Sequence, residues 1–391
     1  MYRLLWFSFM ILNLAFLAKA EKNPDEDTTQ VLLLEDINIQ LESTQAINDM
    51  YNFEFERAER QYRWIKQKYP NHPLSYFLLA LSEWWKIAVN VENTRYDEKF
   101  EAYLDTAIVK AELIYRLPQF KVEGAFFQSA GWAFKGRLYA ERRKWGKAAG
   151  AARNSLKYLD DIKEKGYLSP ELLFGDGLYN YFSVWIRENY PMLKPIMAFF
   201  KKGDKELGLK QLRTVASNAF YTRTEAQYFL MRILAYEEKD MGAAMQISKY
   251  LRDIFPQNAF FHRYYARLLY TTGQIRRTEF ESKLILERID SGKTGYEEVS
   301  GRYAAFYLGE IYEQRRDFEK SEYYYNRTIE FAEAIGATES GYYLYSLIGL
   351  SEIAVAEGDK KKAKEYLKRV RKESKRKHPA NKRARKQLKN L

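Results

Sequence analysis

Small and large side chains recur in a fixed order along this chain, with turn residues between two amphipathic runs. The clearest copy spans residues 302–335. In this copy Gly309 precedes a turn that begins at Asp317, and Ser321 follows the turn. Residues three and four positions apart share one face of a helix, so small side chains at such positions let two helices approach closely. The pattern predicts two antiparallel helices joined by a short turn.

Further copies cover most of the chain. Residues 129–162 and 225–258 repeat the pattern, residues 259–292 repeat it less regularly, and partial copies lie near residues 55–70 and 347–367. Every proline falls near an end of the chain or at a predicted helix boundary, and no run alternates as a strand does. We therefore expect an all-α fold, an α-α superhelix built as a solenoid of antiparallel helix pairs.

In these positions the chain resembles the tetratricopeptide-repeat (TPR) superfamily, and the resemblance covers most of residues 36–377. A second likeness lies within residues 171–235, in the runs 173–179 (LFGDGLY) and 203–209 (GDKELGL). It is similar to a signature of the eukaryotic inclusion-body-clearance TPR family. That family implies the same fold and no agreed biochemical activity.

The resemblance also implies a concave groove, lined by the first helix of each repeat at positions 2, 5, 9 and 12. Arginine beside aromatic rings suits a peptide carboxylate or an extended acidic segment. Packing of the rings between helices is the alternative interpretation. The candidate groove-lining residues are Arg137, Phe229, Tyr236, Phe260, Arg263, Arg267, Tyr270, Tyr303, Phe306, Glu310 and Glu313.

The first 20 residues have the features of a secretory signal peptide. Arg3 precedes an apolar run over residues 4–17, and Ala18-Lys19-Ala20 is a small-x-small sequence that a signal peptidase accepts. We expect residues 21–35 to be a flexible N-terminal segment. The predicted location is exported, periplasmic or secreted, and peripheral to a membrane at most, because no later run is apolar enough to span a bilayer.

Positive charge is concentrated at the C-terminus. Residues 360–391 contain 16 Lys and Arg but only two Glu, a formal charge of +14, while the whole chain carries +12. The preceding residues are thus close to neutral. Residues 378–391 have little to bury, so we expect a basic, disordered tail that contacts an anionic surface or simply solubilises the end of the solenoid.

The residues that carry chemistry are sparse. The chain has no cysteine and only His72, His262 and His378, which are far apart in the sequence. Ser291-Gly292-Lys293-Thr294 lacks the earlier glycine of a phosphate loop, because position 287 is Glu287. We expect no catalytic, cofactor-binding or metal site, and no specific nucleic-acid partner.

The favoured function is an exported, non-enzymatic protein–protein interaction scaffold, with cell-envelope assembly as a candidate setting. Its partner would be a protein or peptide held in the concave groove. A carbohydrate-binding surface protein is one alternative, since abundant Tyr and Trp can stack on sugars. A hydrolase built on a helical repeat is the other.

Overall fold

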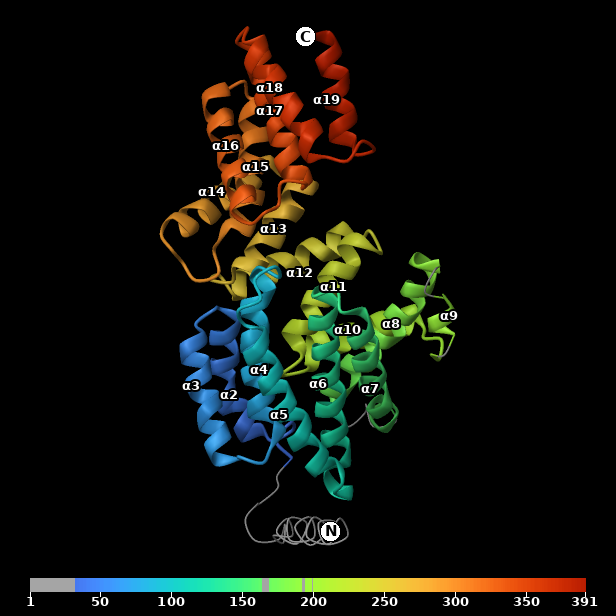
Figure 1. The fold of residues 1–391 in the computed structure, drawn as a ribbon. Coiled ribbons are helices and arrows are strands. Elements are labelled where there is room, and N and C mark those ends of the chain that lie inside the picture. Colours follow the sequence, from blue (N-terminus) through green and yellow to red (C-terminus); the bar gives the residue numbers. More distant parts are fainter. Residues whose placement is uncertain (1–31, 164–168, 192–193, 199) are drawn as a thin grey trace, which may run out of the picture.

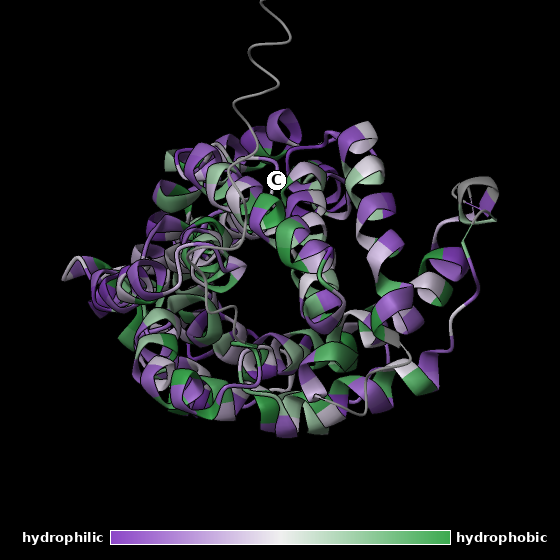
Figure 2. Ribbon diagram, turned by 90° about the horizontal axis from the view of Figure 1, so that it is seen from below, coloured by the Kyte–Doolittle hydropathy of each residue, from purple (hydrophilic) through white to green (hydrophobic). Residues whose placement is uncertain are grey.

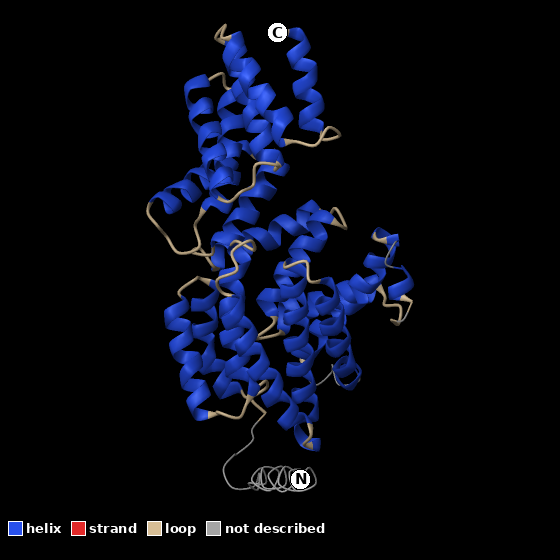
Figure 3. Ribbon diagram, viewed as in Figure 1, coloured by secondary structure: helices blue, strands red, loops and turns tan. Residues whose placement is uncertain are grey.

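The computed structural model describes residues 32–163, 169–191, 194–198 and 200–391, and the regular elements in these ranges are all helical (Figure 3). The signal peptide predicted at residues 1–20 lies outside them. The helices are α2 (Ile37–Tyr51), α3 (Phe55–Lys68), α4 (Pro73–Val89), α5 (Asp97–Tyr115), η1 (Pro118–Phe120), α6 (Lys121–Glu141), α7 (Trp145–Lys163), η2 (Pro170–Leu172), α8 (Leu173–Asn189), α9 (Lys194–Met197), α10 (Lys205–Asn218), α11 (Arg223–Tyr236), α12 (Met241–Ile254), α13 (Ala259–Thr271), α14 (Ile275–Asp290), α15 (Glu298–Gln314), α16 (Phe318–Ala334), α17 (Gly341–Ala356), α18 (Lys360–Glu373) and α19 (Pro379–Asn390).

Consecutive helices pack in pairs, and the pairs stack along the chain (Figure 1). The pairs are α2–α3, α4–α5, α6–α7, α8–α10, α11–α12, α13–α14, α15–α16 and α17–α18. The all-α solenoid predicted from the repeats is confirmed, and its architecture is that of a TPR-like superhelix.

The turn inside most pairs has the same backbone shape. A single residue with positive φ follows the first helix of six pairs. In three of these pairs the next residue is an aspartate whose carboxylate accepts a hydrogen bond from a backbone N–H in the first turn of the second helix. This cap satisfies one of the donors that a helix start leaves free. The positive-φ residues are Phe53, Arg143, Lys239, Gly273, Arg316 and Gly358, and the aspartates are Asp240, Asp317 and Asp359.

Small residues hold the paired helices close together, as the repeat predicts. The hydroxyl of Ser321 donates to the carbonyl oxygen of Gly309 over 2.9 Å, directly across the α15–α16 pair. The ring of Tyr325 lies against Gly309 on α15 and Gly349 on α17, where a Cβ would clash with it. Tyr325 therefore wedges between two successive pairs at a place that only glycine leaves open.

The stack of pairs also closes on itself. The side-chain amide of Asn258, just before α13, donates to the carbonyl oxygen of Tyr51 at the end of α2, over 2.7 Å. The Tyr51 ring packs against Trp85 on α4 and Phe261 on α13. Figure 2, along the long axis, shows the helices arranged as a ring. The first helices of distant pairs thus come together.

Both ends of the solenoid differ from expectation. Leu33 and Leu34, in the segment predicted to be flexible, are buried, and the Leu34 N–H donates to the Glu123 carboxylate over 2.6 Å. In place of a disordered basic tail, residues 379–390 form α19, whose Ala380 and Ala384 are fully buried against the C-terminal core. Two small side chains on one face give this basic segment a surface to pack.

Candidate functional site

A pocket of about 380 Å³ lies where the solenoid closes. It is bordered by α4, α6, α11, α13 and α15 and by the loops that follow α4 and α16. These helices come from two distant parts of the chain, since α4 and α6 begin the second and third pairs whereas α11, α13 and α15 begin the fifth to the seventh. The residues that line it are Trp84, Ala88, Val89, Asn90, Val91, Glu92, Arg137, Glu141, Tyr228, Arg232, Phe260, Arg263, Tyr264, Arg267, Val299, Arg302, Tyr303, Ile335 and Ala337.

The lining contains five arginines and only two acidic residues, Glu92 and Glu141. Arg263, on α13, is the most buried of the five at 8% exposed. Its guanidinium donates to the Val89 carbonyl oxygen over 3.1 Å and to the Ser300 hydroxyl over 3.3 Å, both neutral acceptors. Burial lowers the pKa of Arg263, yet an arginine stays charged at neutral pH.

A carboxyl group lies near Arg263 but forms no ion pair with it within the described residues. Glu297, just before α15, is largely buried, and burial together with the charge of Glu298 raises its pKa. One of its carboxyl oxygens has no hydrogen-bond partner. Glu297 therefore attracts the Arg263 guanidinium only at longer range, without an ion pair between the two.

Arg137, on α6, lies among aromatic rings. Its guanidinium carbon is 4.2 Å from the centroid of the Trp84 ring, and its Nη2 donates to the Tyr228 hydroxyl over 3.2 Å. The nearest carboxylate in the described chain is that of Glu225, 4.0 Å from Nη1, and neither that nitrogen nor the facing oxygen makes a hydrogen bond. Burial raises the pKa of Glu225, while Arg137 opposes that rise.

The other three arginines also contact rings or hydroxyls rather than carboxylates. The guanidinium carbon of Arg267 is 5.0 Å from the Tyr236 ring centroid. Arg302 is 5.3 Å from the Tyr303 ring centroid, and its buried Nε has no hydrogen-bond partner. Arg232, at the exposed rim, donates to the Tyr228 hydroxyl over 2.9 Å. The described residues supply none of these three with an ion pair.

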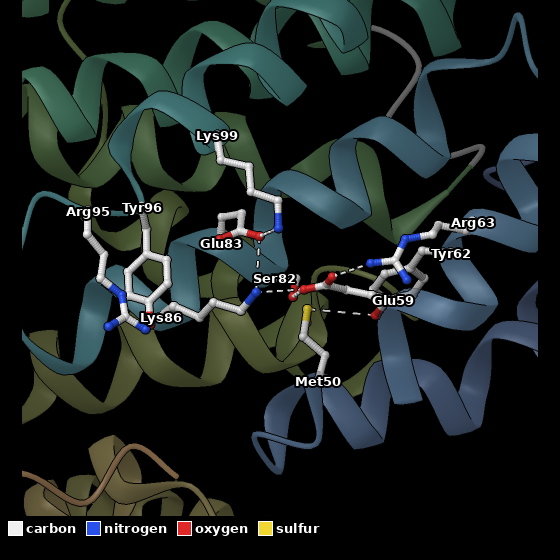
Figure 4. A network of polar contacts seen from close by, with 10 residues as sticks. All are labelled: Met50, Glu59, Tyr62, Arg63, Ser82, Glu83, Lys86, Arg95, Tyr96 and Lys99. Atoms are coloured by element: carbon white, nitrogen blue, oxygen red, sulfur yellow. Dashed lines mark hydrogen bonds and ion pairs between the residues drawn. The ribbon is translucent and has the colours of Figure 1, made fainter. Parts of the chain in front are cut away.

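Buried carboxylates on the other side of α4 are paired with cations. Figure 4 shows a cluster on α3, α4 and α5 in which two buried carboxylates, Glu59 and Glu83, meet three cations. Lys86 lies 2.7 Å from Glu59 and 3.0 Å from Glu83, and Lys99 lies 2.5 Å from Glu83. Arg63 completes the cluster at 2.8 Å from Glu59. In this cluster each buried carboxylate has at least two cations, whereas the pocket arginines have a carboxylate no nearer than 4.0 Å within the described residues.

The residues predicted from repeat positions divide into three groups. Five of them, Arg137, Phe260, Arg263, Arg267 and Tyr303, line the pocket. Two support it from behind, because Phe229 lies under Arg137 and Tyr236 under Arg267. The remaining four lie outside the pocket lining and contact other residues, since Tyr270 bonds to Glu310, Glu313 accepts from Tyr325, and Phe306 is buried in the C-terminal core.

Several pocket residues were not predicted from the sequence. Trp84 and the loop at residues 88–92 come from the α4–α5 pair, which was not matched to the repeat, because the partial copy near residues 55–70 falls on α3. Arg232 and Tyr264 occupy positions next to the expected ones. Tyr228 and Arg232 lie four residues apart on one helix face, and this spacing is the signal that could have identified these two residues.

The histidines have structural roles. The Nδ1 atoms of His72 and His378 accept from backbone N–H groups at the starts of α4 and α19. His262 lies 2.7 Å from the Glu281 carboxylate and 2.9 Å from the Tyr296 hydroxyl inside the core. The described residues contain no cluster of three or more His, Asp or Glu side chains placed to hold a metal. No helix among them has both the length and the apolar character to cross a bilayer.

Comparisons with known proteins concern the fold. No protein-family profile and no curated protein sequence match the chain. Similar solved structures include the human IFIT1 dimer with m7Gppp-AAAA, which is 14% identical with a TM-score of 0.40 over 81% of this chain and 67% of that one. The P58(IPK) TPR domain is 12% identical, with a TM-score of 0.24 over 90% of this chain and 99% of that one. Yeast Tom70 is 9% identical, with a TM-score of 0.26 over 90% of this chain and 95% of that one. At these identities and scores, what those proteins bind carries no argument about this chain.

Proposed function

We propose that the chain is a non-catalytic scaffold that holds an acidic, extended segment of a partner protein on the inner face of its superhelix. The observation that carries the proposal is the pocket, where five arginines project between aromatic rings and only Arg137 has a carboxylate as near as 4.0 Å within the described residues. An anionic partner would supply the missing charge.

The energetic reasoning starts from the cost of the site when it is empty. Removing a charged group from water is expensive unless it is paired and hydrogen-bonded. Arg263 is buried with two neutral acceptors, and Arg137 Nη1 and Arg302 Nε are buried without any. A carboxylate that reaches these atoms gains charge-assisted hydrogen bonds, and the planar guanidinium suits it. The fold maintains this arrangement because each arginine is fixed by a ring beneath it.

An extended peptide suits this place better than a sugar. Sugar recognition needs free aromatic faces, whereas guanidinium groups lie over Trp84, Tyr236 and Tyr303. Covered faces leave charge and hydrogen bonding as the means of recognition.

The setting of the scaffold is also part of the proposal. The signal-like residues 1–20 support export to a periplasm or to the outside of the cell, with envelope assembly as the context. At the other end of the chain, α18 and α19 expose lysines and arginines along two adjacent helices. These helices would contact an anionic surface and hold the scaffold close to it.

Affinity capture from the native envelope tests the function. The bait is residues 21–391, the control bait carries Arg276→Glu with Arg277→Glu on the exposed side of α14, and the pocket variant carries Arg267→Glu with Arg302→Glu. We expect the normal and control baits to capture the same one or few proteins and the pocket variant to lose them. Equal capture by all three baits would overturn the assignment of the pocket as the partner site.

A further inference from the structure

The arrangement of donors in the pocket is richer than a single carboxylate can use. Four arginines approach it from three directions, with Arg137 on α6, Arg263 and Arg267 on α13, and Arg302 on α15. Arg137 Nη1 and Arg302 Nε are buried donors without an acceptor. One carboxylate brings two oxygens and a single negative charge.

The size and charge of the pocket narrow the ligand further. A volume of about 380 Å³ is at the lower end of the range that encloses a compact ligand rather than a long stretch of chain. The lining has a formal excess of three positive charges, from five arginines against Glu92 and Glu141. A phosphoryl group carries a charge of about −2 and three strong acceptor oxygens, so it offsets more of this excess charge than one carboxylate does and has oxygens for both free donors and for Arg263.

We infer that the pocket binds a phosphoryl group, carried by a phosphorylated side chain of the partner segment or by a small phosphate compound. The inference rests on the proposed function in using the same pocket, and it names the anionic group. Arg263 and Arg302 would take its oxygens from the α13–α15 side, and Arg137 from the α6 side. The neighbouring ring of Tyr264 would pack against whatever bears the group.

The test is isothermal titration calorimetry of residues 21–391 with three probes. They are inorganic pyrophosphate, a short peptide containing phosphoserine, and the same peptide with glutamate in that position. The pocket variants are Arg302→Gln and Arg267→Gln, which change half-buried side chains, and the matched control is the exposed Arg276→Gln. Circular dichroism and the thermal midpoint verify that each variant is folded.

We expect a phosphate probe to bind about tenfold or more tightly than the glutamate peptide, because a dianion forms more charge-assisted hydrogen bonds. Each pocket variant should lose about tenfold in affinity, while the control variant binds as the normal chain does. Binding of pyrophosphate without the phosphopeptide would support the inference and identify a small phosphate compound. Binding of the phosphopeptide without pyrophosphate would support it and identify a protein ligand.

Three results would overturn it. They are no binding of either phosphate probe at millimolar concentration, equal affinity for the glutamate peptide, or phosphate binding that both pocket variants retain. Equal affinity for the glutamate peptide would leave the proposed scaffold function standing, with a carboxylate as the ligand. Phosphate binding without any captured partner would instead sustain this inference and remove the scaffold function.

Discussion

The buried carboxylate of Glu171 fixes one loop of the solenoid in place. Glu171 lies in η2, is 2% exposed, and faces the loop that joins α10 to α11. The carboxylate accepts from the backbone N–H groups of Phe220, Tyr221 and Thr222, the last two at 2.9 Å each, and from the Thr222 hydroxyl at 2.6 Å. Thr222 is also the residue before α11, so the same carboxylate lies at the positive end of that helix.

Replacing Glu171 by alanine leaves these donors without their acceptor. A hydrogen bond to a charged group contributes about 1.5–3 kcal/mol, and such bonds within one network do not add fully. We therefore expect Glu171→Ala to lower the free energy of unfolding of this region by about 3–5 kcal/mol. Glu171→Gln keeps one acceptor oxygen and should destabilise by less. Glu206→Ala, at an exposed position on α10, is the control and should change stability by under about 0.5 kcal/mol.

Urea unfolding followed by circular dichroism gives the overall midpoint of each variant. Hydrogen exchange of the amides of Tyr221 and Thr222 reports the local effect. The order of destabilisation should be alanine, glutamine, control, and the two amides should lose most of their protection in Glu171→Ala. Unchanged protection of these amides in the alanine variant would refute the assignment of the carboxylate as their acceptor.

Three more predictions concern other parts of the chain. A Cβ on Gly208 would lie 2.7 Å from the backbone nitrogen of Tyr181, so Gly208→Ala should separate α8 from α10 and cost about 1–3 kcal/mol in urea unfolding. The pKa of Glu279 is lowered to about 2, mainly by the hydrogen bond from Arg315. The charged carboxylate therefore stabilises the fold above about pH 5, and this stabilisation is lost as the pH falls toward 2. Glu279→Gln should flatten the dependence of the thermal midpoint on pH in this range. Deleting residues 379–391 should lower the thermal midpoint, because α19 covers apolar surface of the C-terminal core.

Contacts that recur from one helix pair to the next could be predicted from the sequence, whereas contacts that occur only once could not. The contact of Ser321 with Gly309 recurs in kind along the chain, so small residues at fixed spacing were enough to predict helix pairs, while the concave groove was implied only by the family resemblance. The bond from Asn258 to the Tyr51 carbonyl joins residues 207 positions apart and belongs to no periodic pattern. The contact of α4 with α13, where Arg263 donates to the Val89 carbonyl oxygen, is equally long-range, and for this reason Trp84 could not be placed in the pocket in advance.

Composition was a poor guide at the C-terminus for a related reason. Net charge counts every lysine and arginine in residues 378–391, whereas packing depends on the few side chains on one face. Ala380 and Ala384 are fully buried, and the side-chain amide of Asn381 donates to the carbonyl oxygens of Arg371 and Ser374 at 3.2 and 3.0 Å. Small residues four positions apart were the available signal, and the density of positive charge obscured it.

Closure of the solenoid and charge in the pocket depend on the same residue. Glu225 on α11 accepts from the Trp85 indole on α4 at 3.0 Å and faces Arg137 on α6 at 4.0 Å, so one buried carboxyl group links three of the helices that border the pocket. Its charge is shared between holding α4 in place and partly balancing Arg137. An anion bound at Arg137 competes for the second role and leaves the first intact. The pocket thus stays assembled without a ligand through the Trp85–Glu225 hydrogen bond, while Arg137 Nη1 faces the other Glu225 oxygen without a hydrogen bond to it.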